Sequence, residues 1–226
     1  MKTYYELQEG LQDPNIFKAF FLAGGPGSGK SYVIRKTTGG TGLKVVNSDP
    51  AFEKLLKAAG LSLKMSGDDP RRDIVRGKAK EITKKMKANY LEGRIGLIID
   101  GTGKKYDGIA KQKAELESLG YDCYMIFVNT SLDVALERNL KRERTVPEDI
   151  TIRSWKSVQN NIGKFSNLFK NGMIIVDNNK ANEDVILSVF KRVKSLLKNK
   201  VTNSRARQWV EMEMKRREIT IKPKGF

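Results

Sequence analysis

One octapeptide constrains the fold of this chain more than any other stretch. It reads Gly24-Gly25-Pro26-Gly27-Ser28-Gly29-Lys30-Ser31. It fits the phosphate-loop pattern G-x-x-x-x-G-K-[ST] at every fixed position. A phosphate group needs several backbone N–H donors that converge on one point, and glycine lets the backbone approach that closely. The pattern therefore predicts a loop that binds the phosphates of a nucleotide, with an apolar strand before it and a helix after it.

Two residues of the motif have specific expected roles. Lys30 is expected to reach the β- and γ-phosphates, and the Ser31 hydroxyl to bind Mg²⁺. The alternative is a glycine-rich turn with a chance lysine, but the nearly continuous apolar run 16–23 and the helix-compatible segment 32–36 favour a phosphate site. A dinucleotide-binding fingerprint is disfavoured because its third glycine would fall on Tyr32.

Apolar runs and helical patterns alternate along the rest of the chain. Strands are expected at 16–23, 43–46, 95–99, 123–128 and 173–176. Helices are expected at 32–36, 50–59, 70–91, 106–118, 132–140, 147–169 and 183–197. This alternation predicts an α/β chain with a three-layer P-loop NTPase fold, that is, a mainly parallel five-stranded sheet with helices on both faces.

The same patterns predict the apolar faces and the domain boundary. In helix 70–91 one face carries Ile74 or Val75, Ala79, Ile82, Met86 and Tyr90. In helix 132–140 the inward residues are Leu132, Ala135, Leu136 and Leu140. Residues 1–200 are expected to form the P-loop domain, and 201–226 a basic C-terminal helical extension or tail. Its large apolar anchors are Trp209, Val210, Met212 and Met214. A packed terminal helix, a dimer arm and a nucleic-acid-binding tail all fit this segment.

Two aspartates stand at the carboxyl ends of expected strands, where an α/β sheet places its ligand. Asp100 follows an apolar strand, as does the carboxylate that holds Mg²⁺ beside a phosphate-loop hydroxyl. Asp49 ends the second strand and is placed to accept the proton of an attacking hydroxyl. The alternatives are a turn aspartate at Asp100 and a helix N-cap at Asp49, where Pro50 follows.

A pair of arginines follows the fourth strand. Arg138 and Arg142 are four residues apart in an expected helix and therefore share a face. Arginines above the phosphates neutralise the charge of a transferring phosphoryl group. The alternative is a solvated basic helix end, which the helix dipole also favours.

Composition excludes several kinds of chemistry. The chain has 226 residues and no histidine, so histidine bases, imidazole ligands and histidine-dependent triads are excluded. Its one cysteine, Cys123, lies in an apolar run and is expected to be a buried small hydrophobe. No apolar run is long enough to span a membrane and the N-terminus lacks a signal-peptide core, so a cytoplasmic location is expected. The formal charge of +17 fits either a polyanionic partner, most plausibly nucleic acid, or general solvation.

These features together resemble the polynucleotide kinase and zeta-toxin group of small P-loop kinases. The resemblance spans residues 16–180 and is carried by four stretches: the octapeptide, Asn47-Ser48-Asp49, Asp100-Gly101-Thr102, and Glu137-Arg138-Asn139-Leu140-Lys141-Arg142 with Val146-Pro147. It implies that Asp49 is the general base and that Arg138 and Arg142 form a lid over the donor phosphates. The chain departs from the group at Phe52, where an arginine that holds the substrate phosphate is expected.

The expected function is Mg²⁺-dependent transfer of the γ-phosphoryl group of ATP to a hydroxyl of a nucleic acid, nucleotide or nucleotide-sugar. Two other classes fit part of the pattern. One is an ATPase or GTPase switch, although the guanine-reading Asn-Lys-x-Asp is absent. The other is a nucleic-acid-binding module that uses the basic stretches 71–87 and 205–224. The sequence leaves the acceptor and the oligomeric state open.

Overall fold

A five-stranded, entirely parallel sheet forms the centre of the protein. The computed structural model describes residues 13–63, 69–142, 145–180 and 182–221. The strand order is β2 (Lys44–Val46), β3 (Leu97–Asp100), β1 (Lys18–Ala23), β4 (Asp122–Asn129) and β5 (Met173–Asp177). The expected three-layer α/β fold is confirmed, with every strand pair of this sheet parallel.

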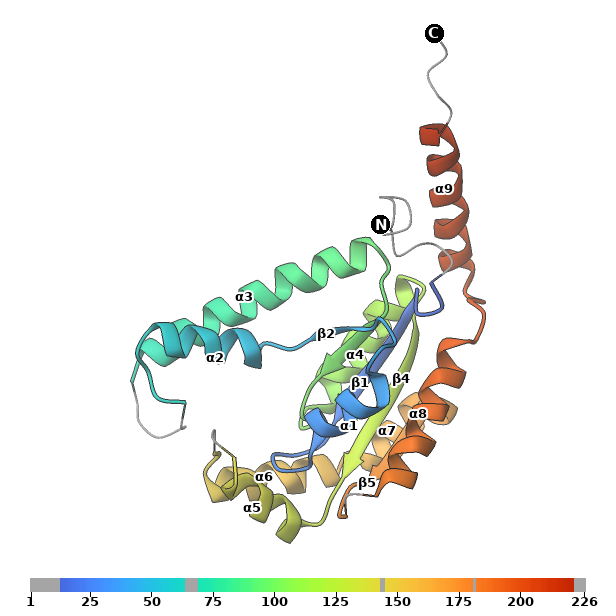
Figure 1. Ribbon diagram of the computed structural model, residues 1–226. Helices are drawn as coiled ribbons and strands as arrows, with labels where there is room; N and C mark the ends of the chain where they lie inside the picture. The colour runs from blue at the N-terminus through green and yellow to red at the C-terminus, as the bar shows by residue number, and fades with distance from the viewer. Residues whose placement is uncertain (1–12, 64–68, 143–144, 181, 222–226) are drawn as a thin grey trace.

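Alternate side chains of β1 enter two separate apolar cores. Phe21 packs with side chains from α4 (Tyr106–Ser118), α6 (Glu148–Gln159) and α7 (Ile162–Phe169). Phe20, on the opposite face, packs with side chains from α1 (Lys30–Thr38) and α8 (Glu183–Leu197). A strand buried on both faces needs a continuous apolar sequence, and β1 has one apart from Lys18. The phosphate loop therefore starts from the most enclosed strand of the molecule (Figure 1).

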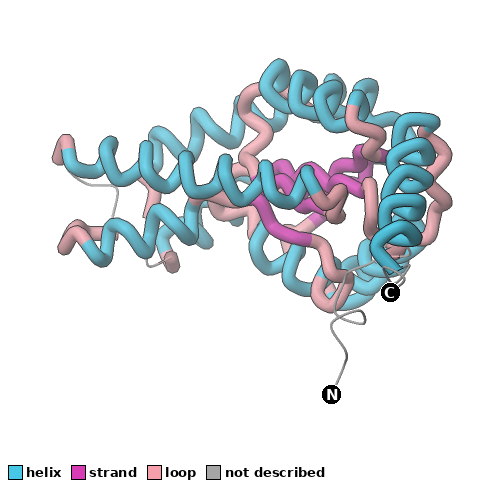
Figure 2. Tube along the Cα trace, turned by 90° about the horizontal axis from the view of Figure 1, so that it is seen from above, coloured by secondary structure: helices cyan, strands magenta, loops and turns pink. Residues whose placement is uncertain are grey.

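A helical arm extends from the sheet on the side of β2. Its helices are α2 (Asp49–Ala58) and α3 (Arg71–Glu92), which lie side by side in both overall views (Figures 1 and 2). A small core of Phe52, Leu56, Val75 and Ala79 joins them. The expected apolar face of α3 is wrong in part. Of the alternatives Ile74 and Val75, Val75 is the buried one, whereas Ile82 is 50% exposed, because α3 packs on α2 through the side of the helix that carries Val75 and Ala79.

Two helical expectations after β4 need correction. The single helix expected at 147–169 is two helices, α6 and α7, with the break at Asn160 and Asn161. The Asn161 side chain donates to the carbonyls of Gly103 and Lys104 at 3.0 and 3.1 Å, so the break joins these helices to the loop after β3. In α5 (Leu132–Leu140), Leu140 is 74% exposed rather than inward, and Asn139 is buried in its place.

The C-terminal segment contains a helix, α9 (Ser204–Ile221), that starts on the body and extends beyond it (Figure 1). Trp209 stacks edge-on against Phe17 with 5.5 Å between ring centroids, and Val210 packs on the same core. The expectation that Met212 and Met214 are anchors is wrong, since they are 64% and 50% exposed. In the described part of the chain, no helix is both long and apolar enough to cross a membrane.

The buried start of β1 supplies a test of this architecture. The Lys18 side chain is 0% exposed and its Nζ lies 2.5 Å from Oδ2 of Asp122, its register partner on β4. Removing the carboxylate would leave a buried ammonium group without its counter-ion. We expect Asp122→Ala to lower the free energy of unfolding by about 3 kcal/mol, and Lys18→Met to change it by less than about 1 kcal/mol. Urea denaturation measures both, and equal losses would contradict this assignment.

Candidate active site

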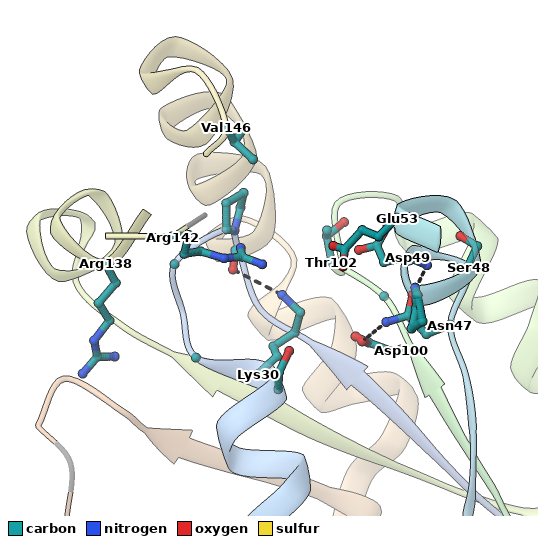
Figure 3. Close-up of a pocket in the computed structure, with 17 residues that line it drawn as sticks. Lys30, Asn47, Ser48, Asp49, Glu53, Asp100, Thr102, Arg138, Arg142 and Val146 are labelled. Carbon is teal, nitrogen blue, oxygen red and sulfur yellow. Dashed lines mark hydrogen bonds between the residues drawn. The ribbon is translucent and has the colours of Figure 1, made fainter. Parts of the chain in front are cut away.

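A cleft lies at the carboxyl ends of the strands, lined on one side by the start of α2 and on the other by α5 and the segment that follows it. Its volume is about 750 Å³. The lining residues are Gly25, Pro26, Gly27, Gly29, Lys30, Ser31, Asn47, Ser48, Asp49, Pro50, Glu53, Asp100, Gly101, Thr102, Arg138, Arg142 and Val146. Thus the phosphate loop, both strand-end aspartates and both arginines, all expected from the sequence, line one cavity (Figure 3).

The phosphate loop has the backbone that only glycine adopts readily. Gly27 and Gly29 have φ angles of 75° and 83°, in the left-handed region. A Cβ atom on Gly27 would lie 1.9 Å from the carbonyl oxygen of Ala135 in α5. At the base of the loop, the Gly24 amide donates to the Thr102 carbonyl at 3.0 Å. The loop is therefore held between the residues after β3 and the side of α5.

Lys30, the first residue of α1, points back over the loop. Its Nζ donates to the carbonyl of Gly24 at 2.6 Å and to that of Gly25 at 3.3 Å. Burial lowers the pKa of Lys30, and the positive charge of Arg142 adds to that effect. The carboxylates of Asp100 and Asp49 act in the opposite direction and raise the Lys30 pKa. The site thus combines a buried ammonium group with two acids across the cavity, which suits a polyanion bound together with a cation.

Asn47 connects the two strand-end aspartates, a role that was not expected from the sequence. Its Nδ2 donates to Oδ2 of Asp100 at 2.7 Å, and its Oδ1 accepts from the Asp49 amide at 2.7 Å. Burial raises the pKa of Asp100, and the nearby charge of Asp49 adds to the rise. Lys30 and the hydrogen bond from Asn47 lower the Asp100 pKa. Asn47 could have been expected, because it follows β2 at the same edge of the sheet.

The start of α2 brings acidic side chains into the cleft. Ser48 occupies the N-cap position, so Asp49 is the first residue of the helix rather than its cap. Glu53 lies one turn further along the same helix and also lines the cavity. Glu53 was not expected as a site residue, although its spacing of four residues from Asp49 places the two carboxylates on one face of the helix. This side of the cleft therefore carries acids and the hydroxyl of Thr102.

The two arginines of α5 and its C-terminal loop point in different directions. Figure 3 shows Arg142 directed towards Lys30, whereas the Arg138 guanidinium turns towards the loop after β5. Arg138 donates through Nη1 to the Asn178 carbonyl at 2.6 Å and through Nη2 to the Asn179 carbonyl at 3.2 Å. The Asn178 side chain in turn donates to the Ser28 carbonyl at 2.8 Å. Sequence reasoning missed this loop, because no motif marks it.

The donor set of the cleft fits Mg²⁺. Within the described residues, no group of three or more His, Cys, Asp or Glu side chains could hold a metal ion by itself. The cleft instead offers the Ser31 hydroxyl and the Asp100 carboxylate. Mg²⁺ prefers such hard oxygen ligands, and in nucleotide sites it keeps several waters and phosphate oxygens in addition. These residues fit a metal that arrives with a nucleotide.

The close approach of Gly27 to α5 leads to a prediction about the loop. Gly27→Ala should force a Cβ atom against the Ala135 carbonyl and a left-handed backbone on alanine, so we expect a loss of about 1–2 kcal/mol of stability from the backbone alone and loss of nucleotide binding. Gly77→Ala in α3 is the matched control. A Cβ atom there meets nothing within 4 Å, so the control should be stabilised by about 0.5–1 kcal/mol. Thermal melting and nucleotide titration check both variants.

The raised pKa of Asp100 leads to a prediction about pH. Above the ordinary pKa of 3.8, the folded protein holds this proton more tightly than the unfolded chain does, so stability falls as the pH rises through this window. We therefore expect Asp100→Asn to raise the melting temperature of the nucleotide-free protein at pH 7, with a gain that shrinks towards pH 4. A lower melting temperature of the Asp100 variant at pH 7 would contradict the assignment.

Comparison with known proteins gives one family. Residues 4–188 match the zeta toxin family model. Among solved structures, a kinase candidate from Chloroflexus aurantiacus superposes with a TM-score of 0.55 at 16% identity, covering 79% of this chain and 97% of that one. The PezAT toxin–antitoxin structure of Streptococcus pneumoniae gives 0.54 at 15% identity, covering 80% and 87%.

A third structure, the complex of AvrRxo1-ORF1 and ORF2 with ATP, gives a TM-score of 0.55 at 14% identity, covering 80% of this chain and 67% of that one. At these identities the superpositions show the fold alone. No curated protein sequence matches the chain significantly. The family model covers most of the chain and agrees with the resemblance carried by its motifs. The protein belongs to the zeta toxin family of P-loop kinases.

Proposed function

We propose that this protein is a Mg²⁺-dependent kinase that transfers the γ-phosphoryl group of ATP to a hydroxyl of a nucleic acid, nucleotide or nucleotide-sugar. One observation carries the proposal: the phosphate loop with Lys30, which follows β1, and the carboxylate of Asp49, which follows β2, line the same cavity. A site that only binds ATP needs no carboxylate opposite the phosphate loop, whereas transfer needs a group that activates the attacking oxygen. ATP in a solved structure of the same fold supports the choice of donor.

We call the side of the cleft that would bind the ATP phosphates the donor half. It is formed by the phosphate loop, Lys30 and Arg142, and its groups can neutralise negative charge. Gly27 and Gly29 line the cavity in left-handed backbone, a conformation in which consecutive N–H groups converge on an anion. Lys30 would exchange its bonds to the Gly24 and Gly25 carbonyls for bonds to the β- and γ-phosphates. Arg142, directed towards Lys30, would neutralise charge on the transferring group.

Ser31 and Asp100 are the residues that would hold Mg²⁺. When bound, the metal supplies charge neutralisation at the phosphate oxygens. Asn47 keeps the Asp100 carboxylate oriented through its 2.7 Å hydrogen bond. Arg138 would act at the edge of the donor half, where its guanidinium braces the loop after β5.

The acceptor half would activate the hydroxyl. Asp49 would accept its proton while the hydroxyl oxygen forms a bond to the γ-phosphorus and the bond from this phosphorus to the bridging oxygen of ADP breaks. Asn47 accepts a hydrogen bond from the Asp49 amide and fixes the start of α2, from which Asp49 projects. Glu53 and Thr102 line the same half and would bind further polar groups of the acceptor.

The arm offers a surface for a larger acceptor. The outer side of α3 exposes Lys78, Lys80, Lys84 and Lys85. A nucleic-acid acceptor would be attracted by such a basic helix, and its affinity would fall steeply with salt. The terminal segment 201–226, which we propose to be an extension of the kinase domain 1–200, is also rich in Lys and Arg.

Substitutions at Asp49 and Lys30 separate transfer from binding. We expect Asp49→Asn to lower transfer by at least about a hundredfold, because the proton acceptor is lost, and to leave ATP affinity within about twofold. Lys30→Ala should lower both the rate of transfer and the affinity for ATP. Asp73→Asn, an exposed change on α3, is the matched control and should leave transfer unchanged. Label transfer from γ-³²P-ATP and ATP titration measure these effects.

The acceptor is identified by offering RNA, DNA, nucleosides, nucleoside monophosphates and activated sugars in separate reactions. Mg²⁺-dependent labelling of one class, lost in the Asp49 variant, supports the proposal. ATP hydrolysis at full rate without any acceptor, insensitive to Asp49→Asn, would instead favour an ATPase. Retained transfer in the Asp49 variant would remove Asp49 as the base.

A further inference from the structure

Asn178 is a buried amide outside the cleft that contacts the phosphate loop. It follows β5, is 5% exposed, and its Nδ2 donates to the Ser28 carbonyl at 2.8 Å across 150 positions of sequence. It does not line the cavity and belongs to none of the motifs of the sequence. Its described hydrogen bond to the loop goes to the Ser28 carbonyl, and Asn178 is not among the residues that line the cavity, so we assign it no direct part in the chemistry.

The contact controls the direction of one peptide group. In a planar trans peptide, the C=O of one residue and the N–H of the next point in opposite directions. Asn178 draws the Ser28 carbonyl towards the loop after β5, so the Gly29 N–H points the other way. Gly29 lines the cavity and Ser28 does not, which agrees with an N–H directed at the phosphates. The reversed peptide would aim a carbonyl oxygen at the anion instead.

The fit at this contact is tight. A Cβ atom on Gly29 would lie 2.3 Å from Nδ2 of Asn178, and the φ of Gly29 is already 83°. Position 29 is therefore glycine for two reasons, the left-handed backbone and the room that the Asn178 amide occupies. The side chain and the loop fit each other as a single unit.

The loop that carries Asn178 is itself braced. Its backbone amide donates to the Asn129 carbonyl at 2.9 Å, and its carbonyl accepts from Arg138 at 2.6 Å. These two bonds hold the Asn178 backbone from the end of β4 and from α5, so the amide approaches Ser28 from a fixed direction. The next residue, Asn179, accepts through Oδ1 from the Ser131 amide at 2.7 Å, and this bond holds the Asn179 side chain rather than Asn178.

We infer that Asn178 is a positioning residue that fixes the Ser28–Gly29 peptide so that the Gly29 N–H donates to the donor phosphates. The inference rests on the proposed function, because it requires that the loop binds a polyphosphate. Asn178 sets the affinity for the phosphate chain and leaves the nucleoside and the acceptor unaffected.

Inorganic tripolyphosphate is the probe, because it presents the phosphate chain without a base. We expect Asn178→Ala to weaken binding of tripolyphosphate and of ATP by about tenfold to a hundredfold, the range for a buried carbonyl that loses its donor. Asn179→Ala is the matched control. It removes a bond that braces the same loop but does not reach the phosphate loop, so binding should stay within about twofold. The KM for ATP should rise in the Asn178 variant while the KM for the acceptor stays constant.

A second measurement needs no variant. In the ¹⁵N-labelled wild-type protein, tripolyphosphate should shift the Gly29 amide resonance downfield, as a new hydrogen bond to an anion does. Unchanged binding in Asn178→Ala, an equal loss in Asn179→Ala, or a silent Gly29 amide would each overturn the inference while the kinase proposal stands. If the wild-type protein binds neither tripolyphosphate nor ATP, both the inference about Asn178 and the kinase proposal are overturned.

Discussion

The parallel register of β1 and β3 is the constraint on which the site depends. Leu22 pairs with Asp100, so the phosphate loop and the acidic end of β3 leave the sheet at the same level. Two backbone bonds extend this match beyond the strands, from Gly101 to the Leu22 carbonyl and from Gly24 to the Thr102 carbonyl. A shift of this register by one residue would reverse the faces of the shorter strand and separate the proposed phosphate and metal ligands.

Burial shifts the pKa values of Lys30 and Asp100, on opposite sides of the cleft, in opposite directions. It lowers the pKa of Lys30 and raises that of Asp100, so both charged forms are disfavoured by desolvation. Each group partly corrects the other, because their opposite charges attract. A bound polyphosphate would add negative charge beside Lys30, and a divalent cation would add positive charge beside Asp100. Both bound ligands would therefore favour the charged forms of these residues, which would link ligand binding to stability.

The sequence predicts the structure best where the function or the helix itself requires a particular residue type at a particular spacing. The glycines of the loop, the acids at the strand ends and helices such as α4 (Tyr106–Ser118) follow from spacing and periodicity. Prediction from the sequence is poorer where packing decides burial, as at Ile82 and Leu140, because periodicity shows an apolar face but not whether another element covers it. Periodicity also does not predict that Arg138 and Arg142 point in different directions, because the Arg138 guanidinium bonds to the loop after β5, which is distant in sequence.

The residues that sequence reasoning missed share one chemical property. Asn47, Asn139, Asn161 and Asn178 are amides that hold backbone or charged groups around the cleft. Asn139, for example, both donates to and accepts from the Val146 backbone, and so closes the segment that carries Arg142. An amide donates and accepts without a charge, whereas a carboxylate in any of these places would disturb the balance between Lys30 and Asp100. A cleft crowded with charges therefore favours neutral side chains for support. Asn47 and Asn139 stand in stretches that carry the family resemblance, but their hydrogen bonds become apparent only in the fold, and Asn161 and Asn178 lie in none of these stretches.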